Sequence, residues 1–408
     1  MDCFSFSCRI QFINMKLVMF CLGAVATFYA APLKVNVQAR SAILMNAETG
    51  AVLYEKDAHL PSYPASTTKI ATALYLLEEK KIDLHQMVTV SPEALRYKPP
   101  NSTEETPAHW LVSDATLMQL VKGERLSAEA LLHGLMMVSG NDAANVLAEA
   151  VSGSVPVFMD ELNAYLKQIG CQGTFFKNPH GYHHPEHITT AYDLAWMTKK
   201  ALQNQTFREL VSKQAYQRPK TNKQPAGELK QRNGLVVEGK HYYPKAIGVK
   251  TGFHSFAQNA LVGAATDQGR TLVAVVLGCP KSNDRYNDTK ALFEAAFAEK
   301  KVESILSPAG QAYSKRIGCA KTQLLAVLFQ PLAISFYPSE EPKVKAFIHW
   351  DLLSLPIRKG QRVGEIRAVD ERGAVLAKQE LFAQDNVSAT LLFSLKQKWN
   401  RLWGLEQR

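Results

Sequence analysis

The sequence predicts an α+β domain over residues 35–298, because strand patterns at both of its ends flank a helical middle. Residues 41–58 alternate apolar and polar side chains around Thr49-Gly50, which predicts a β-hairpin. Three more strand-like runs, joined by short turns, lie within 245–278. We therefore expect one sheet that is assembled from both ends of the segment and is covered by helices.

The middle of this segment has the periodicity of helices. From about Ser66 to Leu210, apolar residues recur at helical spacing. The polar stretch RYKPPNSTEETPAHW, residues 96–110, interrupts the pattern, and its prolines predict a loop. The helices are therefore expected to form a cluster with one long loop in it.

Beyond the α+β domain the pattern changes to that of a small β-sandwich. Residues 302–386 contain short alternating runs separated by Gly and Pro turns, and no cluster of side chains there suggests chemistry. The last segment, 388–408, is instead an amphipathic helix pattern. Its apolar residues fall on one face, namely Leu392, Leu395, Trp399, Leu402 and Trp403, and most of its cations lie off that face, namely Lys396, Lys398 and Arg401. This pattern predicts a helix on a membrane surface, and packing against the β module is the alternative.

The first 31 residues predict a signal peptide. A positive residue, Lys16, precedes a short apolar run that ends in small residues suited to signal peptidase. The start at Met15 fits this pattern better than Met1, and an uncleaved anchor is the alternative. We expect an exported protein that is periplasmic or otherwise extracytoplasmic and peripherally attached to the cytoplasmic membrane.

Composition and cysteine content narrow the remaining possibilities. The formal charge is +10, but no basic block is long enough for a nucleic-acid arm, so no nucleic-acid partner is expected. Outside the leader, the cysteines are Cys171, Cys279 and Cys319, without the CxxC spacing of zinc sites. We expect all three to be small buried thiols and no metal or other cofactor to be required.

A serine and a lysine at the start of one predicted helix suggest nucleophilic chemistry. In PASTTKIATALYLLEE, residues 64–79, a core helix is expected to begin near Ser66. Ser66 and Lys69 are three residues apart and share a face, whereas Thr67 and Thr68 point elsewhere. A lysine that is partly desolvated and near another cation has a lowered pKa and can accept the serine proton.

Two further motifs support this interpretation. Ser139-Gly140-Asn141 lies between two helical runs, and Asp142 is predicted to cap the second. Lys250-Thr251-Gly252 ends a predicted strand. In the order SxxK, SxN and KTG, the three motifs match the serine acyltransferase signature of penicillin-binding proteins and class A β-lactamases.

The sequence resembles more narrowly the low-molecular-mass D-alanyl-D-alanine carboxypeptidases. The segments LMMVSGNDAANVLAEAV, FFKNPHGYHHPEHITTAYDLAWMTKKAL and GVKTGF carry the similarity, which covers about residues 38–295. The resemblance implies the penicillin-binding, β-lactamase-like transpeptidase fold, with an antiparallel sheet and a helical cluster. It also implies the β module and the terminal amphipathic helix.

The resemblance assigns roles to the motif residues. Ser66 would attack the carbonyl between the two terminal D-alanines of a peptidoglycan stem peptide, and Lys69 would be its general base. Ser139 would relay a proton to the leaving D-alanine, and Asn141 would hold the substrate amide. The terminal carboxylate would bind Lys250 and Thr251, while Gly252 allows close approach. The oxyanion would lie between the N–H groups of Ser66 and Phe253. β-Lactams would acylate Ser66 as covalent inhibitors.

The sequence departs from the family at two places and leaves several competing functions open. Gln258 stands where members usually have glycine, which puts the hairpin geometry in doubt, and the 96–110 loop is unusually long. A β-lactamase would need an ExxLN-like loop, which the sequence lacks. The pattern HHPEH at 183–187 formally fits a zinc-protease motif, but Pro185 argues against the helix that this motif needs. The motifs are also compatible with a D,D-endopeptidase and with a non-catalytic penicillin sensor.

Overall fold

A computed structural model of the protein describes residues 32–99 and 105–402. The predicted signal peptide therefore lies outside the described residues. The chain divides into two compact units, Ala31–Glu299 and a second that contains Lys300–Arg408. Each unit is described by itself.

The first unit is built on a five-stranded antiparallel sheet of order β2-β1-β9-β8-β7. Its strands come from both ends of the segment, as the sequence predicts: β1 (Ser41–Asn46), β2 (Val52–Lys56), β7 (Ala246–His254), β8 (Gln258–Asp267) and β9 (Arg270–Cys279). Because β7 is an edge strand, one row of its backbone groups is not paired within this sheet.

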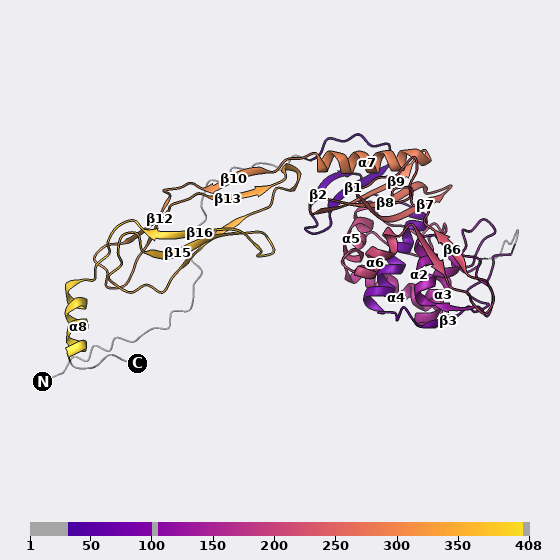
Figure 1. Ribbon diagram of the computed structural model, residues 1–408, viewed down its shortest axis with the longest axis horizontal. Coiled ribbons are helices and arrows are strands. Elements are labelled where there is room, and N and C mark those ends of the chain that lie inside the picture. Colours follow the sequence, from indigo (N-terminus) through magenta and orange to yellow (C-terminus); the bar gives the residue numbers. More distant parts are fainter. Residues whose placement is uncertain (1–31, 100–104, 403–408) are drawn as a thin grey trace. The chain divides into compact units, whose positions relative to one another are not determined.

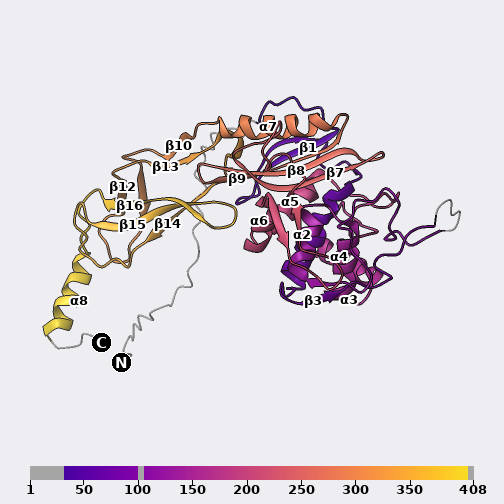
Figure 2. The same cartoon turned by 45° about the vertical axis from the view of Figure 1, so that its right-hand side comes forward.

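Helices cover both faces of the sheet. Helix α7 (Ser282–Phe297) lies across one face, while the remaining helices of this unit lie on the other (Figures 1 and 2). The helical cluster comprises α1 (Lys69–Leu74), α2 (Ala128–Met136), α3 (Asn141–Ser152), α4 (Val155–Gln168), α5 (Ala191–Ala201) and α6 (Gln205–Ser212). This arrangement confirms the predicted α+β class.

Local sequence explains where most of these helices begin. The side chains of Ser127, Ser154, Thr190 and Asn204 each accept a hydrogen bond from a backbone N–H of the helix that follows. Such caps satisfy donors that the first helical turn leaves unpaired.

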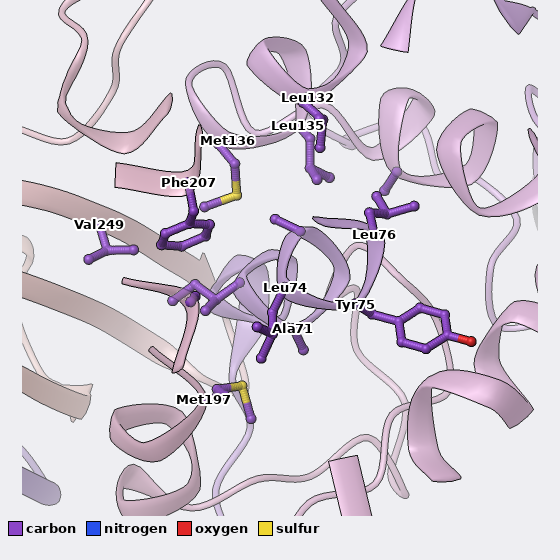
Figure 3. Packing of buried hydrophobic residues seen from close by; sticks show 14 of the residues in the cluster. Ala71, Leu74, Tyr75, Leu76, Leu132, Leu135, Met136, Met197, Phe207 and Val249 are labelled. Atoms are coloured by element: carbon purple, nitrogen blue, oxygen red, sulfur yellow. The ribbon is translucent and has the colours of Figure 1, made fainter. Parts of the chain in front are cut away.

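Helix α1 lies at the centre of the core that the helical cluster forms against the sheet. Leu74 from α1, Leu135 from α2 and Phe207 from α6 are all buried together with Val249 from β7 (Figure 3). The strand that carries Lys250 and the helix that carries Lys69 therefore share one hydrophobic core, which fixes their mutual position.

Two short strand pairs inside this unit were missed by the sequence patterns. Strand β3 (Met87–Thr89) pairs with β4 (Arg125–Ser127), and β5 (Ala215–Arg218) pairs with β6 (Gly227–Lys230). Strands of three or four residues are too short to show clear alternation, which explains why the pattern did not reveal them.

The second unit has the predicted all-β character. Its five-stranded sheet has the order β11-β12-β16-β15-β14, and β10 pairs separately with β13. The strands are β10 (Val302–Ser307), β11 (Ala312–Lys315), β12 (Leu324–Leu328), β13 (Leu332–Phe336), β14 (Lys345–Trp350), β15 (Arg362–Val369) and β16 (Val375–Ala383). They enclose a separate hydrophobic core.

The C-terminal helix α8 spans Leu391–Leu402, within the predicted segment. The side chains of Leu392, Leu395 and Trp399 are exposed. Trp403 and the side chains of Lys396, Lys398, Arg401 and Leu402 lie outside the described part of the structure. Among the described helices, none has the length and apolar character needed to cross a membrane.

The cysteine prediction is correct for two residues and wrong for the third. Cys171 and Cys279 are buried free thiols, whereas Cys319 is exposed. Cys319 lies in a turn of the β module and has φ 66°, a conformation found mainly in turns, which lie at protein surfaces.

Candidate active site

Ser66 lies in a 3₁₀ turn, Ala65–Thr68, that leads directly into α1. The two neighbouring hydroxyls are committed to this turn. Thr67 donates a hydrogen bond to the carbonyl of Pro64 at 2.8 Å, and Thr68 donates to that of Ala65 at 2.9 Å. Ser66 is half-buried, and its hydroxyl faces Lys69 instead. Of the three consecutive hydroxyls, Ser66 is therefore the one suited to be a nucleophile.

Lys69 is completely buried, and its ammonium group contacts three acceptors. Its Nζ donates to Ser66 Oγ at 3.1 Å, to Asn141 Oδ1 at 2.8 Å and to the carbonyl of His180 at 2.6 Å. Burial, followed by the positive charge of Lys250, holds the pKa of Lys69 well below its usual value, and Asp142 opposes this shift. A lysine in this environment can lose its proton and then accept one from Ser66.

The second motif is brought to the same place by the junction of α2 and α3. Ser139 is buried with φ 66°, a strained conformation for a residue other than glycine. Asn141 is the first residue of α3, and its N–H donates to the carbonyl of Thr116 at 2.8 Å. Strained backbone of this kind persists where the surrounding structure fixes it, and here it presents the Asn141 side chain to Lys69.

Asp142 is not the N-cap residue of α3, which corrects the sequence-based prediction, although its carboxylate does accept from the N–H of Ala143 in the first turn of that helix at 2.9 Å. Gly140 occupies the cap position, and no side chain bonds there. The buried Asp142 carboxylate also accepts from the N–H groups of Met118 at 2.8 Å and Leu120 at 3.0 Å. It thereby joins a distant segment of the chain to the second motif, a contact that the sequence near Asp142 does not reveal.

The segment 178–187 forms another wall of the site. Its Gly181 has φ 89°, and a side chain there would place Cβ 1.9 Å from the carbonyl oxygen of Ala65. Only glycine allows this approach. The contact holds the neighbouring His180 carbonyl against Lys69. His180 is buried beside Lys69, and its pKa is lowered to about 3, chiefly by burial, so the imidazole is neutral.

The same segment does not have the geometry of a zinc-protease motif. Residues 183–187 form a turn rather than a helix. Both ring nitrogens of His187 are already bonded, since Nδ1 accepts from the Lys177 N–H at 3.1 Å and Nε2 lies 2.8 Å from Thr68 Oγ1. Because Thr68 donates to Ala65, His187 Nε2–H is the donor to Thr68. His187 therefore supports the Ser66 turn and is not free to bind a metal ion.

Strand β7 passes directly beside the Ser66 turn. A Cβ at Gly252 would lie 2.8 Å from the Pro64 carbonyl oxygen and 3.2 Å from Ser66 N. This glycine is therefore required for the strand to lie against the Ser66 turn. Phe253 follows on the strand with its side chain 65 % exposed. The two backbones that are expected to supply oxyanion donors thus lie side by side.

Lys250 is the centre of a cationic group. It is buried, and its Nζ donates to the carbonyl of Thr251 at 2.9 Å. Burial, and then the charges of Arg232 and Arg285, lower its pKa to about 7. Arg285, on α7, also donates to the carbonyl of Gly252 at 3.2 Å. These cations can bind a carboxylate.

Sequence motifs did not identify Arg232, Arg285 or His180 as parts of the site. Both arginines lie outside the three motifs and approach Lys250 only in the folded chain. His180 contributes a backbone carbonyl, which carries no residue-type signal. The segment NPHGYHHPEH was noted as similar to the family, but its contacts could not be inferred from spacing.

The doubtful position at Gln258 is accommodated without loss of the hairpin. Gln258 pairs with His254 across the β7–β8 turn and has φ 55°. Glycine adopts this left-handed conformation without cost, whereas glutamine must be held in it. The strand geometry is therefore preserved despite the substitution.

Comparison with known proteins identifies the family. Residues 26–281 match the Peptidase_S11 family of D-alanyl-D-alanine carboxypeptidases. The chain belongs to this family. The D-alanyl-D-alanine carboxypeptidase DacF of Bacillus subtilis is 28% identical and is aligned over 86% of both chains. DacD of Salmonella typhimurium is 29% identical over 89% of this chain and 90% of its own.

Solved structures of related proteins have the same fold. Penicillin binding protein 5 from Haemophilus influenzae superimposes with a TM-score of 0.59 at 26% identity, over 88% of this chain and 100% of its own. The Streptomyces K15 DD-transpeptidase gives a TM-score of 0.57 at 30% identity, over 65% of this chain and 99% of its own. The predicted family, fold class and serine-peptidase class are confirmed. The roles of individual residues remain predictions.

Proposed function

We propose that this family member is a serine-type D-alanyl-D-alanine carboxypeptidase that removes the terminal D-alanine from peptidoglycan stem pentapeptides. One observation carries the proposal: the buried Lys69 Nζ contacts Ser66 Oγ at 3.1 Å. A cationic group around Lys250 lies on the adjacent strand. This pairs an activated nucleophile with a site for a free C-terminal carboxylate.

The reaction follows from these positions. Neutral Lys69 accepts the proton of Ser66 Oγ as that oxygen attacks the carbonyl between the two D-alanines. The N–H groups of Ser66 and Phe253 stabilise the negative charge that develops on the carbonyl oxygen. Ser139 relays the proton that Lys69 accepted to the leaving D-alanine nitrogen, and the C–N bond breaks. Water then hydrolyses the ester, which releases the shortened peptide and restores Ser66.

The cationic group accounts for the preference for a chain end. Lys250 and Thr251 bind the terminal carboxylate, and Arg285 and Arg232 add positive charge beside Lys250. β-Lactams carry a carboxylate and a strained amide in a similar arrangement. They therefore acylate Ser66 as covalent inhibitors.

The decisive experiment measures D-alanine release from a pentapeptide muropeptide. Wild type is expected to release D-alanine, Ser66→Ala to release none, and the control Ser212→Ala, an exposed serine at the end of α6, to retain activity. Unchanged release by Ser66→Ala would contradict the mechanism. Cleavage of cross-linked dimers alone would assign the protein as a D,D-endopeptidase.

We also propose that the protein is exported and that α8 binds the outer surface of the cytoplasmic membrane. The leader pattern supports export, and exposed Leu392, Leu395 and Trp399 on α8 support surface binding. Co-sedimentation with anionic vesicles tests the second part. We expect the purified full chain to bind and the variant Leu395→Ser/Trp399→Ser to bind at least about tenfold less. Equal binding by both would contradict the proposal.

A further inference from the structure

A pocket of about 420 Å³ opens beside the β7–β8 turn. It is lined by ten residues, of which Arg40 is the only charged one. Ser62, Tyr63 and Gln258 supply its other polar side chains. None of these residues belongs to the three motifs, so the pocket needs an explanation of its own.

Aromatic rings connect this pocket to the surroundings of Ser66. Tyr63 and Phe256 line the pocket and also pack against His183, with ring centroids 4.7 and 3.9 Å away, respectively. His254, two residues after Gly252, lies 5.4 Å from the His183 ring. Burial lowers the pKa of His254 to about 4 and that of His183 below its usual value, so both imidazoles are neutral at pH 7. The rings therefore form an uncharged surface on which methylene groups can pack.

The direction of the bound peptide follows from the edge position of β7. A peptide can add to this edge as an antiparallel strand. With its terminal carboxylate at Lys250 and Thr251, its acyl portion runs toward His254 and the β7–β8 turn. Each residue of an extended strand advances about 3.3 Å, so the third residue from the C-terminus reaches the level of His254. Its side chain can then extend along the rings toward the pocket.

The polar side chains of the pocket suit a ligand with negative charge. The Arg40 side chain is exposed, and within the described residues its guanidinium forms no ion pair. Gln258 keeps a left-handed φ of 55° in which glycine would be unstrained. Strained residues concentrate at functional sites, and this one places a side-chain amide, which can donate hydrogen bonds to a carboxylate, in the pocket wall.

We propose that this pocket is a subsite for the side chain of the third residue from the substrate's C-terminus, and that it selects an aliphatic chain ending in a carboxylate. The methylene groups pack on the rings of Tyr63 and Phe256. The carboxylate pairs with Arg40 and accepts a hydrogen bond from the Gln258 amide. The inference rests on the proposed carboxypeptidase function, because the peptide direction depends on it.

The test compares three synthetic peptides of the form Nα-acetyl-L-Lys-D-Ala-D-Ala. Their ε-amino groups carry a succinyl group, its neutral succinamoyl analogue or a butanoyl group. We expect wild type to cleave the succinyl peptide with a kcat/KM about threefold to tenfold above that of the succinamoyl peptide at low salt, and the ratio to fall as salt is added. Arg40→Gln is expected to bring the ratio to about 1, and the control Arg208→Gln, an exposed arginine on α6, to leave it unchanged.

Gln258→Gly separates recognition from folding. Because glycine relieves the left-handed backbone, this variant is expected to unfold at the same or a higher temperature while its succinyl preference falls about twofold. Equal cleavage of the three peptides by wild type would overturn the subsite but leave the carboxypeptidase function intact. A preference for the succinyl peptide that persists in Arg40→Gln would also overturn the subsite and leave the carboxypeptidase function intact. Failure to release D-alanine from any of the three peptides would instead overturn the proposed function and the subsite with it.

Discussion

Gly181→Ala should disrupt the site at a position that contains no reacting group. The new Cβ would lie 1.9 Å from the Ala65 carbonyl oxygen and 2.5 Å from its carbon, both backbone atoms. The residue also has φ 89°, where an L side chain is disfavoured by about 1 to 2 kcal/mol. Overpacking against backbone adds about 1 to 3 kcal/mol. We therefore expect a loss of about 2 to 5 kcal/mol in the free energy of unfolding.

Catalysis should suffer as well, because the segment must move to relieve the clash. A shift of Gly181 displaces the adjacent His180 carbonyl, which accepts from Lys69 at 2.6 Å. A misplacement of about 1 Å in a catalytic group can lower the rate by about 100-fold. We expect the acylation rate with a fluorescent penicillin to fall at least about tenfold.

Gly153→Ala is the matched control. Gly153 has φ 77°, yet among the described residues none beyond its immediate neighbours in the chain lies within 4 Å of the position of its missing Cβ. Alanine at this position is disfavoured by the backbone conformation but meets no clash. The free energy of unfolding should therefore fall by about 1 kcal/mol, and the acylation rate should be unchanged. Thermal unfolding and stopped-flow acylation of both variants give the comparison. Equal stability and equal acylation for the two variants would refute the reasoning.

Three further predictions concern titration and the support of the second motif. Lys250→Gln removes a charge that lowers the pKa of Lys69, so the acid limb of the acylation rate against pH should move to higher pH; an unmoved limb would contradict the coupling. Asp142→Asn leaves at least one N–H from the distant segment without its acceptor, which should cost about 1 to 3 kcal/mol in urea unfolding and slow acylation. Stability and acylation equal to those of wild type would show that this link is unimportant. The lowered pKa of His180 means that the unfolded chain binds one more proton between about pH 6.5 and about 3, so this group removes about 1.4 kcal/mol of stability per unit as pH falls. His180→Gln should reduce that slope, and an unchanged slope would be inconsistent with a neutral buried imidazole.

Much of the architecture could be predicted because its signals are local. The hairpin at 41–58 alternates, the three strands of 245–278 are strand-like runs joined by short turns, and helical periodicity identified the cluster between them. The pairing of Ser66 with Lys69 followed from their spacing. Their chemical meaning, however, depended on two motifs far away in the sequence.

The remaining features depend on contacts between distant segments. No local sequence pattern predicts the close approach of Gly181 to the Ala65 carbonyl or the hydrogen bond from Arg285 to the Gly252 carbonyl. Asp142 illustrates the difficulty, since its place at the start of α3 predicted a contact within that helix but did not predict that its carboxylate also binds a segment that precedes it by more than 20 residues. Gln258 shows the converse, because tertiary packing holds a residue in a conformation that its type disfavours.

Locating the covalent adduct of a β-lactam tests which residue is the nucleophile. Wild-type protein is incubated with benzylpenicillin, digested, and analysed by mass spectrometry. We expect one penicilloyl group on the peptide that contains Ser66, at the hydroxyl that Lys69 contacts. An adduct on Ser139, Thr67 or Thr68, or D-alanine release with no adduct on Ser66, would contradict the assignment of the nucleophile.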